Sequence, residues 1–341
     1  MKRYGVMDRE QLVQAIVDAA ALWLDADASH RSELHTAVLA DANVFTESNL
    51  AFALNRFFHS LKADVLKGLA EHTSRCAPQS IVIERTHVGV DLLGLEAQVL
   101  AIVAGHTCEV IGDAEEWTIA HAFWTEVERR IGTALPISFE VAVPDTRAVS
   151  WRIPHNPEQP SEAWPLGYAV AVLDGRESKA GLEGLAEDLL VHDGAGFRSP
   201  KLVFAPESLS PDDVLDACAQ FRAVIPGHPD VPSRLKMTQA FLHATGTPHA
   251  WSEDLTFLIS RGDPEPQANG HVRWCTWTDF AYVETWLRHH ANATSLVVAR
   301  PSLLAKLDVP QVKRKLGEAH KPVFGTSAFS RLCLALLNGA A

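Results

Sequence analysis

From residue 80 onward, short apolar segments alternate with amphipathic segments, and this alternation is the feature that most restricts the fold. Tyr168–Leu173, Lys201–Phe204 and Ser295–Ala299 have the length and the apolar character of buried strands. Between the first two, Leu182–Leu190 has the spacing of a helix with one apolar face. Strands separated by helices predict a mostly parallel sheet that is covered by helices on both faces. The sequence therefore predicts an α/β fold.

The N-terminal part of the chain has a different pattern, in which apolar residues recur at helical spacing. Further along the chain, Leu95–Val103 is apolar enough for a helix or a strand. Near the C-terminus, Ser302–His320 is expected to form one or two helices. The polar, proline-rich stretch Pro154–Ser161 is the best candidate for a domain boundary. The N-terminal helices are expected at Asp8–Leu24, Ser29–Ala40 and Glu47–Glu71.

Composition argues against several classes of function. The formal net charge is −12 without clusters of Lys and Arg, which is a poor match to nucleic acid or an anionic membrane. The five cysteines are scattered and odd in number, which argues against a disulfide framework and for a reducing compartment. No apolar run approaches the roughly 18 residues of a membrane span, and the N-terminus lacks the features of a signal peptide. We therefore expect a cytoplasmic protein.

The most informative segment is a strand, a helix, a Gly-x-Gly turn and a second strand, between Ala171 and Glu207. Gly194 and Gly196 allow positive φ and a close approach of a ligand to the backbone. Arg198 places a fixed positive charge beside the turn. An isolated Gly-x-Gly is more often only a tight turn with a surface arginine, so the surrounding residues decide its meaning.

Those surrounding residues resemble one family, the acyl-CoA reductases best known from the fatty-acid reductase of bacterial bioluminescence. This family belongs to the aldehyde dehydrogenase superfamily. The resemblance implies an aldehyde dehydrogenase-like fold, with two α/β domains of mostly parallel sheets and a helical N-terminal segment. The residues that match the family pattern in order and approximate spacing are Gly175, Glu177, Ser178, Leu185, Ala186, Asp188, Gly194, Gly196, Arg198, Ser199 and Pro206.

The resemblance also implies how the chain divides into parts. Residues 1–78 would be the helical N-terminal segment and residues 79–160 a degenerate nucleotide-binding-type α/β domain. Residues 161–323 would be the catalytic-type α/β domain. Residues 324–341 would form a tail that packs back on the first domain. Because relatives in the superfamily usually assemble as dimers or tetramers, we expect a homodimer.

Phe197 stands where the family carries its nucleophilic cysteine. The family reduces an acyl thioester to an aldehyde, through a thiolate that attacks the acyl carbonyl and a nicotinamide hydride. A phenyl ring cannot attack a carbonyl or accept a proton. The region that matches the family's cofactor loop, Val88–Leu95, also lacks the Ala-Gly-Asn type of sequence found there. We therefore expect no cofactor, with NADPH bound only if the ancestral site is retained.

The candidate cleft residues follow from the same resemblance. Glu177 fits a base near the cleft as well as it fits a carboxylate at a helix start. His192 could orient a ligand, although a histidine in a loop is usually solvated. The spacing of histidines and cysteines fits no metal motif, so no metal site is expected. The complete set of candidates is Glu177, His192, Gly194, Gly196, Phe197, Arg198 and Ser199.

Three functions remain open, and the sequence does not decide whether the chain is an enzyme. The first is a pseudoenzyme without redox activity that binds an acyl thioester of CoA or a carrier protein, or docks on a partner enzyme. The second is an enzyme that reuses the cleft for acyl transfer, condensation or cyclisation, with Glu177, His192 or Arg198 as polar groups. The third is an active NAD(P)H-dependent acyl reductase with a relocated thiol, such as Cys275, although a strand cysteine beside tryptophans is more typical of a core.

Overall fold

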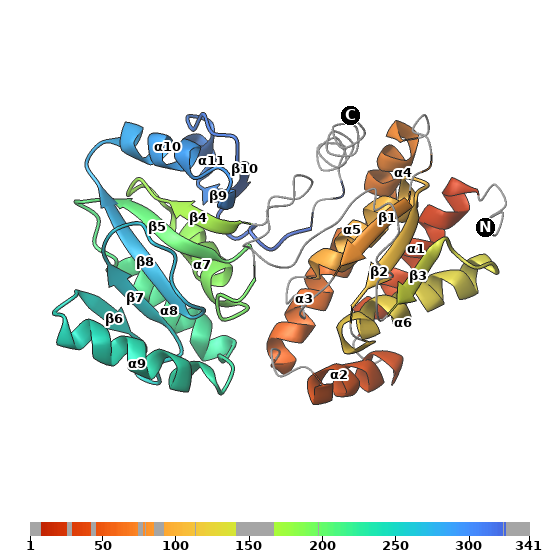
Figure 1. The fold of residues 1–341 in the computed structure, drawn as a ribbon, viewed down its shortest axis with the longest axis horizontal. Helices are drawn as coiled ribbons and strands as arrows, with labels where there is room; N and C mark the ends of the chain where they lie inside the picture. Colours follow the sequence, from red (N-terminus) through yellow and green to blue (C-terminus); the bar gives the residue numbers. More distant parts are fainter. Residues whose placement is uncertain are drawn as a thin grey trace. The chain divides into compact units, whose positions relative to one another are not determined.

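The computed structural model describes residues 8–25, 29–41, 46–73, 78, 80–84, 92–112, 114–140, 167–196, 198–322 and 324. The chain forms two compact units (Figure 1). The first comprises Met1–Trp164 and Lys321–Ala341, and the second Pro165–His320. Residues 141–166, which include the expected strand Val149–Ile153, lie outside the described part of the chain.

The first unit packs helices on a three-stranded parallel sheet of order β1-β2-β3. Its core contains an aromatic cluster in which the Phe58 ring lies 5.1 Å from Trp23 and 5.2 Å from Phe123. Phe324 is buried in the same core, with its ring 5.7 Å from Phe57. The elements are α1 (Arg9–Leu24), α2 (Ser29–Asp41), α3 (Glu47–Ser60), α4 (Ala63–His72), β1 (Ser80–Glu84), α5 (Leu93–Val103), β2 (Thr107–Ile111), α6 (Ala114–Ile131) and β3 (Ile137–Glu140).

The single helix expected at Glu47–Glu71 is two helices. The helix α3 begins with a capping box between Thr46 and Asn49 and ends at Ser60. Leu61 then leaves the helical conformation, with φ −80° and ψ 79°, and remains buried. The apolar periodicity continues through this break, because the side chains on both sides of it face the same core. Periodicity alone therefore did not reveal the change of direction.

The second unit is built on a seven-stranded sheet of order β10-β9-β4-β5-β8-β7-β6. Its strands are parallel except for the antiparallel pair β6 and β7. The sequence analysis missed β6, a short strand at one edge of the sheet. The elements are β4 (Tyr168–Val172), α7 (Lys179–Leu190), β5 (Pro200–Pro206), α8 (Asp212–Val224), α9 (Val231–Ala244), β6 (His249–Trp251), β7 (Leu258–Arg261), β8 (His271–Trp277), α10 (Phe280–His289), β9 (Thr294–Ala299), α11 (Pro301–Leu304) and β10 (Val312–Lys315).

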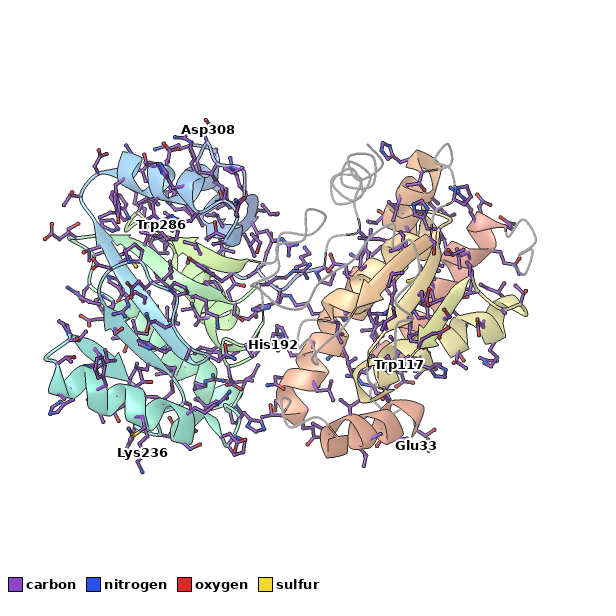
Figure 2. The ribbon with its side chains drawn as sticks, viewed as in Figure 1. Glu33, Trp117, His192, Lys236, Trp286 and Asp308 are labelled. Atoms are coloured by element: carbon purple, nitrogen blue, oxygen red, sulfur yellow. The ribbon has the colours of Figure 1, made fainter. Side chains whose placement is uncertain are left out.

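Both faces of this sheet are covered, as the alternation of strands and helices predicted. Along β4, Ala169 and Ala171 pack with α7 and α8, whereas Val170 and Val172 pack with α10 and α11. Figure 1 shows these two pairs of helices on opposite sides of the sheet. Figure 2 marks Trp286 of α10, whose ring lies 5.0 Å from that of Phe204 in β5. This arrangement confirms the expected α/β fold with mostly parallel strands.

The helices expected at Ser302–His320 are wrong for most of that range. The chain forms only the short helix α11 and then the edge strand β10, whose residues alternate between half-buried and exposed. Pro310 lacks the backbone N–H that a continuing helix needs, and Gly317 has φ 81°. Val312–Lys315 therefore pairs with β9 instead of forming a further turn of helix.

No helix within the described ranges is long and apolar enough to cross a membrane.

Candidate functional site

The register of β4 and β5 decides which candidate residues lie together. The strands are parallel, and Ala169 pairs with Pro200 while Val172 pairs with Phe204. The Gly-x-Gly turn precedes β5, and Glu177 follows β4. Because neighbouring parallel strands begin at the same edge of a sheet, the turn and Glu177 lie at opposite edges. The structure therefore separates Glu177 from the other described candidates.

The Glu177 carboxylate is engaged by its own loop. It accepts hydrogen bonds from the backbone N–H groups of Asp174 at 2.9 Å and Gly175 at 3.0 Å. Asp174 in turn forms an ion pair with Arg300, whose Nε lies 2.6 Å from Oδ1, and this contact holds the pKa of Asp174 below its usual range. Ser178 caps α7 by accepting a hydrogen bond from the Gly181 N–H at 3.1 Å. The family-like residues Glu177 and Ser178 therefore have a structural role, because they hold the backbone of this loop and the start of α7.

The turn between α7 and β5 is compact and buried. The N–H of Asp193 donates to the Leu190 carbonyl, and the N–H of Ala195 donates to the His192 carbonyl, both at 2.8 Å. Ala195 is the one exposed side chain among the described residues of Val191–Pro200. His192, Gly194, Gly196, Arg198 and Ser199 are all buried within it. Phe197 lies outside the described residues.

Gly194 is required by both backbone angle and space. Its φ is 70°, in the left-handed region that favours glycine. A Cβ atom at this position would lie 3.1 Å from the backbone nitrogen of Gly270, in the segment that leads into β8. The expected positive φ is therefore found at Gly194 but not at Gly196. The atoms that approach Gly194 are backbone atoms of the protein itself, whereas a close approach by a ligand was expected.

A buried ion pair fixes the turn to α8. Asp193 has φ 53°, and its Oδ1 accepts a hydrogen bond of 2.7 Å from the Arg222 guanidinium. The exposed fractions of the two side chains are only 4% and 6%. The other Asp193 oxygen accepts the backbone N–H of His228 at 3.1 Å. Burial lowers the pKa of Arg222, and the Asp193 carboxylate acts in the opposite direction.

Lys201 joins the turn to the segment before β8. Its ammonium group donates to the Gly194 carbonyl and, at 2.6 Å, to the Asn269 side-chain oxygen. Burial lowers the pKa of this lysine to about 8. The sequence analysis did not select Lys201, although a lysine at the start of an otherwise apolar strand was a visible signal. It also did not select Arg222, which lies in α8, 29 residues along the chain from its partner Asp193 in the turn.

His192 is buried rather than solvated, with 3% of its surface exposed. Its ring lies 4.9 Å from that of His320, nearly perpendicular to it. His320 donates through Nε2 to the Asp188 carbonyl at 2.9 Å, and the Asp188 carboxylate accepts the N–H groups of Gly317 and Ala319. Asp188, part of the family-like pattern, therefore anchors the segment after β10 to α7.

Arg198 is also buried, with 8% of its surface exposed, so it is not the surface arginine of an ordinary tight turn. The Ser199 hydroxyl is fully buried and has no hydrogen-bond partner among the described residues. The Ser199 N–H donates to the Gly196 carbonyl at 3.0 Å. The turn thus concentrates polar groups in a buried place, immediately beside the position of Phe197.

The described cysteines are core residues. Cys108, Cys218 and Cys275 are buried, and burial raises the pKa of each thiol, to about 12 for Cys218 and Cys275. Such thiols carry almost no thiolate at neutral pH. Cys76 and Cys333 lie outside the described residues. Within the described ranges, no group of three or more His, Cys, Asp or Glu residues is arranged to hold a metal ion.

Comparison with known proteins gives a match in structure but not in sequence. No protein-family model matches this sequence. No curated protein matches it either. An NAD-dependent benzaldehyde dehydrogenase from Corynebacterium glutamicum superposes with a TM-score of 0.65 at 13% identity, covering 95% of this chain and 82% of the other. An oxidoreductase from Marinobacter aquaeolei superposes with a TM-score of 0.63 at 10% identity, covering 92% and 78%.

A third similar structure is the glyceraldehyde-3-phosphate dehydrogenase GapN from Methanocaldococcus jannaschii, which was solved in complex with NADP. Its TM-score is 0.62 at 10% identity, and the match covers 91% of this chain and 81% of that one. At such low identity a structural match establishes the fold alone. The chain has the fold of the aldehyde dehydrogenases.

Proposed function

We propose that this protein is an acyl-CoA reductase-like member of the aldehyde dehydrogenase superfamily that has lost redox activity and binds an acyl thioester. The thioester would be carried by CoA or by a carrier protein. The observation that carries the proposal is the buried turn before β5 with Gly194, Gly196, Arg198 and Ser199. By the family resemblance, Phe197 of the sequence stands at the position of the family's nucleophile. A turn that keeps the family's glycines and polar residues but has no nucleophile is better suited to binding a thioester than to covalent catalysis.

The described cysteines offer no replacement for the missing nucleophile. Cys218 and Cys275 are buried thiols whose pKa values are raised to about 12, and Cys108 is buried in the core of the first unit. A reductase of this family needs a thiolate that can reach the acyl carbonyl. This argument counts against an acyl reductase that uses one of these thiols.

The separation of Glu177 from the turn also bears on the proposal. A general base must lie within hydrogen-bond reach of the group that it deprotonates. Glu177 follows β4, at the opposite edge of the sheet, and its carboxylate is occupied by two backbone N–H groups. We therefore propose no catalytic role for Glu177 at the turn. His192, Arg198 and Ser199 remain as the polar groups that would surround the ligand.

Further parts of the proposal follow from the family resemblance. We propose that the first unit is a degenerate form of the family's nucleotide-binding domain, with weak or no affinity for NADPH. The net charge of −12 and the scattered cysteines favour a cytoplasmic protein. The resemblance favours a homodimer. As an alternative to an acyl thioester, the bound species could be a partner enzyme.

A calorimetric titration with an acyl-CoA tests thioester binding, and Ala195 offers a suitable probe. Ala195 is exposed within the turn, so Ala195→Trp adds bulk at its surface without filling the core. Ala281, exposed on α10 across the sheet, provides the matched control Ala281→Trp. We expect saturable binding by the wild type and the control, and at least about a tenfold loss of affinity for Ala195→Trp, equal to 1.4 kcal/mol.

The proposal fails if neither an acyl-CoA nor an acyl carrier protein binds saturably to the wild type. It also fails in its location if Ala195→Trp binds as the wild type does. Micromolar affinity for NADPH would contradict the loss of the cofactor site, and this titration is run on the same sample.

A further inference from the structure

The helix α9 is apolar on two sides. On one side, Val231, Leu235 and Leu242 are buried in a small core of the second unit. On the other side, Met237 and Phe241 lie about one helical turn apart, and 78% and 65% of their surfaces are exposed. Exposed apolar side chains that are grouped, rather than scattered singly, mark surfaces for interaction.

Only basic charges border these two side chains. Arg234 precedes Met237 by three positions and therefore lies on the same side of the helix. Lys236 projects from α9 as well (Figure 2). The chain has no Asp or Glu from Val231 to Ser252, although the whole protein has a net charge of −12. The exposed residues that form what we call the α9 surface are Arg234, Lys236, Met237, Ala240, Phe241 and Ala244.

The α9 surface begins beside the candidate site. The segment that leads into α9 is held by the turn, because the backbone N–H of His228 donates to the Asp193 carboxylate at 3.1 Å. A Cβ atom on Gly270, whose backbone nitrogen lies close to Gly194 of the turn, would be 3.3 Å from the Leu235 side chain. A partner that lies along α9 is therefore next to the turn where the acyl thioester would bind.

We propose that the α9 surface docks an acidic acyl carrier protein, which presents its thioester to the turn. This inference rests on the proposed function and narrows the choice between CoA and a carrier protein. Acyl carrier proteins are small, helical and strongly acidic, and they bear the acyl group on a flexible phosphopantetheine arm. The positive charge of α9 attracts such a partner, whereas the net negative charge of the protein as a whole repels it from other approaches. Met237 and Phe241 then supply the apolar centre of the interface.

A second copy of this chain fits the α9 surface less well. A symmetric dimer through α9 would bring Arg234 and Lys236 of both copies into one interface, without an acidic residue from either helix. Like charges that meet across an interface lower the affinity. Charge complementarity therefore favours an acidic partner over self-association.

A titration with an apo acyl carrier protein tests the docking surface. The apo form lacks both the arm and the acyl group, so its binding does not depend on a thioester site. The full-length protein is titrated in a calorimeter, and we expect saturable binding at low salt that weakens at high salt. Arg234→Glu and Phe241→Ser should each lower the affinity at least about tenfold, because arginine and aromatic side chains dominate the affinity of protein interfaces.

Two variants on other parts of the second unit are matched controls. Lys306→Glu changes the net charge by as much as Arg234→Glu does, at an exposed position outside α9. Tyr282→Ser removes a partly exposed aromatic ring from α10. Both controls should bind the carrier protein as the wild type does.

The proposal is overturned if the wild type does not bind the apo carrier protein, or if Arg234→Glu and Phe241→Ser bind it as the wild type does. Self-association in light scattering that both α9 variants abolish would assign the surface to a second copy instead. The affinity for acyl-CoA is measured on the same variants and should be unchanged. Docking on α9 and binding of a thioester can therefore each fail without the other.

Discussion

The Asp193–Arg222 ion pair gives the sharpest prediction about stability. Removing one partner of a buried pair leaves the other charge without compensation, which costs about 3–5 kcal/mol. Asp193→Asn keeps the shape of the side chain and tolerates the φ of 53°. It can also still accept the His228 N–H. We therefore expect a loss of about 3 kcal/mol that reports the charge on Asp193.

Asp193→Ala removes these remaining supports as well. A non-glycine residue without a polar side chain pays about 1–2 kcal/mol for the left-handed conformation. We expect a total loss of about 5 kcal/mol, which is a large part of the 5–15 kcal/mol of a typical domain. Arg222→Met added to Asp193→Asn removes the uncompensated guanidinium, so the double variant should be more stable than Asp193→Asn alone.

The assay is hydrogen exchange of the β5 peptide, followed by mass spectrometry at increasing urea concentration. It reports on the second unit separately, because a chain of two units need not unfold in one transition. The reasoning is refuted if Asp193→Asn lowers the free energy of unfolding by less than about 1 kcal/mol. It is also refuted if the losses caused by Asp193→Asn and by Arg222→Met, each measured alone, simply add in the double variant.

Three further predictions concern Gly184, Glu177 and Lys201. Gly184→Ala should lower the free energy of unfolding by about 1–3 kcal/mol, because its Cβ would lie 2.9 Å from backbone atoms of Gly317. A thermal transition in calorimetry that is unchanged from wild type would contradict this contact. Glu177→Ala should cost about 1 kcal/mol and leave acyl-CoA affinity unchanged, whereas lost affinity would return Glu177 to the site. Lys201 has a folded pKa of about 8 and an ordinary value of 10.5, so its unfolded form binds more protons between these values. The cost of its burial is therefore fully present below pH 8 and is relieved by at most about 3 kcal/mol as pH rises to 10.5; urea titrations in which wild type gains nothing relative to Lys201→Arg over this window would contradict it.

The sequence was sufficient for the inner strands of the second unit and for the helices that cover both faces of its sheet. The strands Tyr168–Leu173 and Ser295–Ala299 were recognisable because both of their faces are buried, which makes them continuously apolar. It was not sufficient where a contact distant in sequence decides the conformation. The break at Leu61 and the edge strand β10 depend on packing and pairing that no local pattern records.

The candidate site divides in the same way. Gly194 could be predicted because its conformation is a local property of a turn. The separation of Glu177 from the turn follows from the parallel pairing of β4 and β5, which the alternation of strands and helices already predicted; the family resemblance alone did not indicate it. The burial of His192 and Arg198 depends on His320 and on neighbouring segments, which a local motif does not contain.

The most direct test of the central claim is the rate of NADPH oxidation by the wild-type protein in the presence of excess acyl-CoA. If Phe197 takes the place of the family's nucleophile, as we propose, and because the described thiols are buried, we predict no oxidation above the rate without protein, from a sample that binds the acyl-CoA. Oxidation of NADPH that requires the acyl-CoA and is abolished by iodoacetamide would show a working thiol and contradict the account.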